Sequence, residues 1–165
     1  MGSDCSSDLP KTAEQLANSL QRLHDRVKTC PKTFALIDIA DDVSPLYSDP
    51  SRDRHTICVV EEPLDIVALE KTGQYQGTYH VLGGVISPID GIGPEQLHIP
   101  ELLERIKTDE ATEIIIATNA SVEGESTALF LQRYIQEAVP FFCDNLIALI
   151  SELTPSNHLR APPVA

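Results

Sequence analysis

Two buried hydrophobic runs of this chain are each followed by a group of acidic and amide side chains. The first run, residues 57–60, leads into Glu61 and Asp65, and the second, residues 113–118, leads into Asn119, Glu123 and Glu125. In a parallel sheet the carboxyl ends of the strands meet at one edge, where ligands bind. We therefore expect these five side chains to line one crevice. Carboxylates gathered in this way are the ligands that Mg²⁺ prefers.

The elements that must position this crevice are indicated by hydrophobic periodicity. Runs rich in Val and Ile predict strands over residues 55–60, 78–82 and 113–118. Amphipathic runs between and after them predict helices over residues 64–71, 100–107 and 126–137. Strands that alternate with helices are typical of a parallel sheet covered on both faces. The expected fold class is α/β, with a Gly- and Pro-rich loop over residues 83–94.

The N-terminal region predicts a helix that stands before this unit. Leu16, Leu20, Leu23 and Val27 recur at four- and three-residue steps and share one face of a helix predicted over residues 12–28. This face fits an oligomerisation arm and fits equally a helix folded back on the main domain.

The other flanking segments carry weaker patterns. Residues 30–54 are rich in Asp, Ser and Pro and are expected to form an irregular connector. Apolar residues 142, 146, 149, 150 and 153 share a helical face and predict a short terminal helix. The Pro-rich tail that follows cannot continue such a helix.

The composition bounds what the chain binds. It has 25 Asp and Glu against 12 Lys and Arg, so its net charge is −13. Because phosphate affinity comes from Lys and Arg, we expect weak DNA binding by the chain alone, although a basic partner can bring it to DNA. Four scattered cysteines predict free thiols in a reducing cytoplasm. No apolar run is long enough to predict a membrane span.

Four ordered blocks of sequence carry a family resemblance. They are Val59-Val-Glu-Glu-Pro-Leu-Asp65, Tyr79-His-Val-Leu-Gly-Gly84, Ser87-Pro-Ile-Asp-Gly-Ile-Gly-Pro-Glu95 and Ala117-Thr-Asn-Ala-Ser-Val-Glu-Gly-Glu125. Over residues 49–137, the blocks and their spacing resemble RecR, a bacterial family of recombination mediators. The resemblance implies a Toprim domain, which is a Rossmann-like parallel sheet flanked by helices.

The resemblance also bears on the acidic crevice. Toprim enzymes hold Mg²⁺ with a glutamate after one strand and two aspartates after a later one. Here Glu61 matches the glutamate, while Asn119 and Ser121 stand at the aspartate positions. The RecR family, which this chain resembles, also has an asparagine at the position of Asn119, and that family acts without catalysis. We therefore expect no enzyme activity and only weak Mg²⁺ binding. A Mg²⁺-dependent phosphoryl-transfer enzyme and an inactive relic of the family are the alternatives.

A zinc module of the family is expected to be lost. RecR carries two CxxC pairs just before its Toprim domain, and the matching positions here are Cys30, Thr33, Ser44 and Tyr47. Structural zinc needs four nitrogen or sulfur donors. The resemblance therefore implies a degenerate, zinc-free connector, and no other cofactor is expected.

The resemblance further implies partners. RecO-like and RecF-like proteins would bind the crevice to assist the loading of a recombinase on single-stranded DNA, with DNA engaged mainly within that complex. The expected partner loop carries Gly83, Gly84, Asp90, Gly91 and Gly93. No membrane contact is expected, and a homo-oligomer is left open.

The resemblance fails at both ends of the chain. Nothing like the family's helix-hairpin-helix precedes Thr12, and the pattern is lost after Glu137, through a shifted reading frame near residue 138 or through divergence. The expected organisation is therefore a polar N-terminus with a helix (1–29), the connector (30–54), the Toprim domain (55–138) and a divergent tail (139–165).

Overall fold

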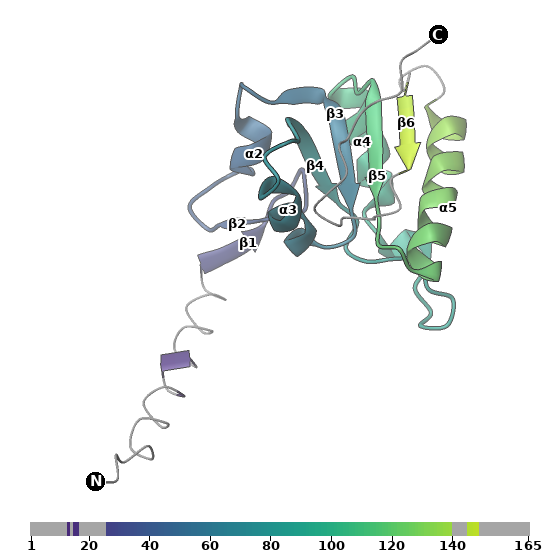
Figure 1. Cartoon of the computed structure of the whole chain (residues 1–165), viewed down its shortest axis with the longest axis horizontal. Coiled ribbons are helices and arrows are strands. Elements are labelled where there is room, and N and C mark those ends of the chain that lie inside the picture. The colour runs from purple at the N-terminus through teal and green to yellow at the C-terminus, as the bar shows by residue number, and fades with distance from the viewer. Residues whose placement is uncertain (1–12, 14, 17–25, 140–144, 149–165) are drawn as a thin grey trace.

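A parallel sheet of four strands forms the centre of the molecule. The computed structural model describes residues 13, 15–16, 26–139 and 145–148. In order across the sheet, the strands are β4 (Gly77–Val81), β3 (Asp53–Val60), β5 (Glu113–Ala117) and β6 (Asn145–Ala148). Val60 lies opposite both Val81 and Ala117, so β3, β4 and β5 end at the same edge. Figure 1 shows this arrangement, which confirms the predicted α/β class.

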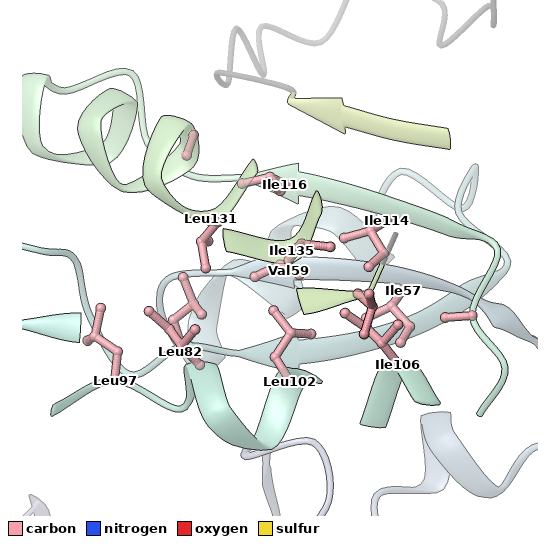
Figure 2. Packing of buried hydrophobic residues seen from close by; sticks show 14 residues of the cluster. Ile57, Val59, Leu82, Leu97, Leu102, Ile106, Ile114, Ile116, Leu131 and Ile135 are labelled. Carbon is pink, nitrogen blue, oxygen red and sulfur yellow. The ribbon is translucent and has the colours of Figure 1, made fainter. Parts of the chain in front are cut away.

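Helices cover both faces of the sheet. On one face, α4 (Ile99–Thr108) and α5 (Val122–Ala138) pack on a cluster of fully buried aliphatic side chains. Figure 2 shows the side chains of both helices gathered against those of β3 and β5. The helices contribute Leu102, Ile106, Leu131 and Ile135, and the strands contribute Ile57, Val59, Ile114 and Ile116. On the other face, Ile66 of α3 (Pro63–Glu70) packs with Cys58, Val60, Tyr79 and Val81.

Among residues 13, 15–16, 26–139 and 145–148, no helix combines the length and the apolar character that crossing a bilayer requires.

The connector is more regular than predicted. It contains β2 (Leu36–Asp38) and a short helix, α2 (Pro45–Ser48), and β2 pairs antiparallel with β1 (Val27–Thr29). The prediction of a helix reaching residue 28 is therefore wrong at its end. Val27 continues the apolar spacing of the leucines, but backbone pairing with Asp38 places it in a strand. Residues 13, 15 and 16 are helical, and most of the predicted helix lies outside the described residues.

The prediction of a terminal helix is wrong for residues 145–148. These residues form β6, which pairs parallel to β5 with Leu146 opposite Ile114 and Ile147 opposite Ile115. A short apolar run fits a buried strand as well as a helix, and the open edge of β5 decides between them. The rest of the predicted terminal helix lies outside the described residues.

Candidate functional site

The two acidic turns are tied together by one carboxylate. Glu61 directly follows β3 and is only 6% exposed, so its charge needs partners inside the protein. Asn119 provides a partner for each of the two carboxylate oxygens: its backbone N–H donates to Glu61 Oε1 at 2.7 Å, and its Nδ2 donates to Oε2 at 2.5 Å. The turn after β3 and the turn after β5 are therefore held side by side, as the sequence predicts for these two residues.

A close approach of α5 completes this arrangement. The Ser121 side chain caps the helix by accepting a hydrogen bond from the Gly124 N–H at 3.0 Å. A Cβ atom at Gly124 would lie 2.2 Å from the Asn119 carbonyl oxygen and 3.0 Å from Glu61 Oε1, so only glycine fits there. The Glu61 carboxylate thus lies at the N-terminus of α5, where negative charge is stabilised. The helix starts at Val122, four residues before the predicted start.

The other predicted crevice residues lie in the first turns of two helices. Asp65 is half-buried and accepts a hydrogen bond from the Glu62 N–H at 2.9 Å, which caps its own helix α3. Glu123 is half-buried and Glu125 is exposed in the first turn of α5. The structure thus joins Glu61 directly to Asn119. It places Glu123 and Glu125 in the first turn of α5, and we call these two acids the acidic rim.

The Glu61–Asn119 pair does not fit the magnesium site of Toprim enzymes. Mg²⁺ needs several oxygen ligands around it, but each Glu61 oxygen accepts a hydrogen bond from Asn119. The Asn119 side chain donates a hydrogen bond at the position where an aspartate would place a second negative charge. Within the described part of the chain, no group of three or more His, Cys, Asp or Glu side chains is arranged to hold a metal ion.

The predicted partner loop forms a hydrogen-bonded turn with an apolar tip. Ser87 and Ile92 exchange two backbone hydrogen bonds of 3.0 and 2.8 Å, and the Ser87 hydroxyl donates to Asp90 Oδ2 at 2.7 Å. Gly91 has a φ of 71°, which favours glycine at this turn. Ile89, at the tip, is 91% exposed. A large apolar side chain is therefore presented to solvent on an ordered loop.

Both ends of this loop are attached to the rest of the molecule. At its start, the Gly83 N–H donates to the Glu61 carbonyl at 3.0 Å, and the Ile86 N–H donates to the Thr127 hydroxyl of α5 at 2.9 Å. At its end, the ring of His98 stacks on Phe34 of the connector with ring centroids 3.7 Å apart. The roles of Thr127 and Phe34 were not predicted: Thr127 closely follows the block that ends at Glu125 but carries no charge that would mark it, and Phe34 belongs to no motif.

The four positions of the expected zinc module are all interior. Cys30, Thr33, Ser44 and Tyr47 are 0%, 2%, 4% and 7% exposed. The Cys30 sulfur accepts backbone hydrogen bonds from Thr33 at 3.4 Å and Ser44 at 3.3 Å. Burial raises the pKa of Cys30, but hydrogen bonds from Thr33, Lys32 and Ser44 outweigh it and lower the pKa overall. One thiol among these four side chains does not fit tetrahedral zinc.

The comparisons with known proteins fit this fold and crevice. Residues 55–141, more than half of the chain, match the family model described as "Toprim domain". The protein therefore carries a Toprim domain, and its close relatives narrow the class further.

"Recombination protein RecR" of Moorella thermoacetica is 49% identical over an alignment 140 residues long, which covers 77% of this chain and 70% of the relative. The RecR of Rubrobacter xylanophilus is 44% identical over 122 residues, or 74% of this chain and 60% of the relative. The RecR of Deinococcus radiodurans is 47% identical over 123 residues, which cover 74% of this chain and 54% of the relative. The chain belongs to the RecR family, and it spans about 54–70% of the length of these relatives.

Proposed function

We propose that this chain is a non-enzymatic mediator of recombinational DNA repair in the cytoplasm. It binds RecO-like and RecF-like proteins through the crevice and through the loop of residues 83–94, and it engages DNA mainly within the resulting complex. Membership of a family whose relatives are called recombination proteins supports the general role. The pair of hydrogen bonds between Glu61 and Asn119 is the observation that supports binding without catalysis.

These hydrogen bonds favour binding over catalysis. The single buried carboxylate at the crevice holds two turns together through both of its oxygens, and the asparagine beside it donates hydrogen bonds instead of adding the second negative charge that would favour Mg²⁺. No feature of the described residues favours the alternative of a phosphoryl-transfer enzyme. What the crevice presents outward is a rim of acidic side chains, of which Glu125 is exposed and Glu123 half-buried.

The chemistry of this surface indicates the kind of partner. An acidic rim is complementary to a surface rich in Lys and Arg, which speeds encounter and fixes orientation. Ile89, at the tip of the loop, adds an apolar side chain of the kind that anchors interfaces when a partner pocket covers it. The same acidic charge, in a chain with a net charge of −13, repels a phosphate backbone.

A pair of charge reversals on α5 tests the proposal. Glu123→Arg changes the rim, and Glu137→Arg makes the same change in net charge near the other end of the same helix. The helix rises ~1.5 Å per residue, so the two positions are about 21 Å apart. We expect Glu123→Arg to weaken the binding of a RecO-like protein about tenfold or more, and Glu137→Arg to leave it unchanged. Equal effects of the two reversals in isothermal titration calorimetry would refute the assigned surface.

DNA binding by the chain alone provides a second test. Fluorescence anisotropy with labelled single-stranded DNA, near physiological salt, should give weak binding without a RecO-like partner and clear binding with it. Sub-micromolar binding by the chain alone would contradict the proposal, because binding of that strength requires a basic surface.

A further inference from the structure

The connector keeps a fixed fold although three of the four expected zinc ligands are missing. Zinc in such a module joins two separate segments of chain and supplies far more free energy than any single hydrogen bond. Here the two segments are joined directly by the Ser44 N–H, which donates to the Cys30 sulfur 14 residues away. One weak N–H···S bond cannot replace a metal ion, so other contacts must hold the connector.

Those contacts centre on Tyr47, in the last of the four ligand positions. Its hydroxyl donates to Asp109 Oδ1, at the end of α4, at 2.8 Å. Burial raises the pKa of Tyr47, and Asp109 raises it further, so the hydroxyl keeps its proton. The Tyr47 hydroxyl is therefore a hydrogen-bond donor to Asp109 and not a deprotonated metal ligand. It reaches across to the Toprim domain, 62 residues further along the chain.

The acceptor of this bond is itself fixed in the interior. Asp109 Oδ2 accepts from Arg105 Nε at 2.9 Å, and both side chains are only 6% exposed. Arg105 also donates to the Thr78 hydroxyl at 2.6 Å and to the Tyr79 carbonyl, both on β4. A continuous network of hydrogen bonds thus leads from the connector through α4 to the sheet.

Cations surround the Tyr47 ring as well. Lys32 Nζ lies 5.2 Å, Arg54 Cζ 5.0 Å and Arg105 Cζ 4.9 Å from the ring centroid. An aromatic face attracts cations at these distances. The ring therefore also contacts side chains from the connector (Lys32), from β3 (Arg54) and from α4 (Arg105).

We propose that Tyr47 replaces zinc as the anchor of the connector, by fastening it to Asp109 of the Toprim domain instead of closing it on a metal ion. The connector is then not a self-contained module. Its fold depends on docking against α4 and β4, where the Val81 N–H also donates to the Thr33 carbonyl at 2.9 Å. Metal removal leaves its stability unchanged, whereas loss of the Tyr47 contacts opens it locally.

Two buried cysteines allow this opening to be measured in the full chain. Cys30 lies in the connector and Cys58 lies in the core beside β4, and both are free and buried. Thiol labelling of the folded protein, followed by peptide mapping, reports how often each site opens. Tyr47→Ala should increase the labelling rate of Cys30 at least tenfold and leave that of Cys58 unchanged. Tyr47→Phe, which keeps the ring, should give an increase of about tenfold or less. Tyr134→Ala, on α5 far along the sequence, is the matched control and should change neither rate.

The chelator experiment completes the test. Wild-type protein should contain no stoichiometric zinc and should melt at the same temperature with and without a chelator. The triple variant Thr33→Cys, Ser44→Cys, Tyr47→Cys should bind about one Zn²⁺ per chain and become chelator-sensitive. A wild-type melting temperature that falls on chelation would overturn the proposal. So would unchanged Cys30 labelling in Tyr47→Ala, or an equal increase in the labelling of Cys30 and Cys58 in that variant, because neither result is compatible with a local anchor.

Discussion

The acidic crevice and the connector both lack the ligands that a metal ion would need, but protein groups take the metal's place in different ways. In the crevice, one residue, Asn119, satisfies a buried carboxylate through two short hydrogen bonds, one from its backbone N–H and one from its side-chain amide. In the connector, an aromatic side chain fills the interior and hydrogen-bonds to a distant helix. The first replacement keeps a charged, accessible rim. The second removes the site from the surface altogether.

This difference separates a surface available for recognition from a structural element. Asn119 is exposed and Glu123 half-buried, so solvent reaches both side chains. All four connector positions are buried, so solvent does not reach them. The loss of metal ligands therefore has no single meaning. What it does depends on whether the replacing group remains at the surface.

Gly124→Ala should have the largest effect on the crevice. The added Cβ atom would meet the Asn119 carbonyl oxygen at 2.2 Å, so either α5 or the turn that carries Asn119 must move. Overpacking of this kind costs about 3 kcal/mol, although alanine is otherwise the better helix former. Urea denaturation should show the loss, and Glu125→Ala, at the next exposed helix position, should change stability little. A Gly124→Ala variant as stable as wild type would mean that the close approach is unimportant.

Acid should weaken the contact between the connector and β4. His80 of β4 lies near Phe34 of the connector, with ring centroids 5.6 Å apart, and its Nε2 lies 2.8 Å from the His98 carbonyl. Burial, mainly, lowers the pKa of His80 to about 3. The unfolded chain therefore binds a proton below pH ~6.5 that the folded chain rejects, and stability present above that pH is lost on acidification.

The expected loss is about 2 kcal/mol between pH 6.5 and 5, from a slope of about 1.4 kcal/mol per pH unit. His80→Gln keeps a hydrogen-bonding group at the same reach but does not titrate, so it should flatten this slope. His55→Gln is the control: a hydrogen bond with the Glu110 carbonyl raises the pKa of His55, so its contribution has the opposite sign. Equal slopes for His80→Gln and wild type in pH-dependent melting would exclude His80 as the cause.

The sequence predicted the sheet well because its strands are continuous runs of buried Val and Ile. The predicted strands over residues 55–60, 78–82 and 113–118 differ from the observed ends by one or two residues. It predicted β1 and β6 wrongly, because their residues also fit a helix and only pairing with β2 and β5 decides. The start of α5 was predicted four residues too late, because glycine disfavours helices and Gly124 lies in the first turn of α5, where a close contact requires it.

The site was predicted only in part for a similar reason. Glu61 and Asn119 follow neighbouring strands, so topology alone brings them together. The role of Tyr47 was not predicted, because the residue was judged only as a zinc ligand. Its partner Asp109 is 62 residues away and belongs to no motif, so a sequence pattern could not join them.

Asn119→Asp gives the smallest expected effect and the most direct test of how the crevice does without a metal. The change removes the Nδ2 donor and places a second carboxylate where the 2.5 Å bond to Glu61 now lies. Two carboxylates this close repel one another until one takes up a proton. Because Asn119 is exposed and water screens part of this repulsion, we expect a loss of only about 1 kcal/mol at neutral pH. Millimolar Mg²⁺ should restore it, since paired carboxylates bind the ion and ligand binding stabilises the folded state. Asn119→Ala is the control, because it loses the same hydrogen bond without gaining a charge and should not respond to Mg²⁺. Melting curves with and without Mg²⁺ distinguish the variants. A wild-type protein stabilised by Mg²⁺ as strongly as Asn119→Asp would show that the amide does not take the place of the metal.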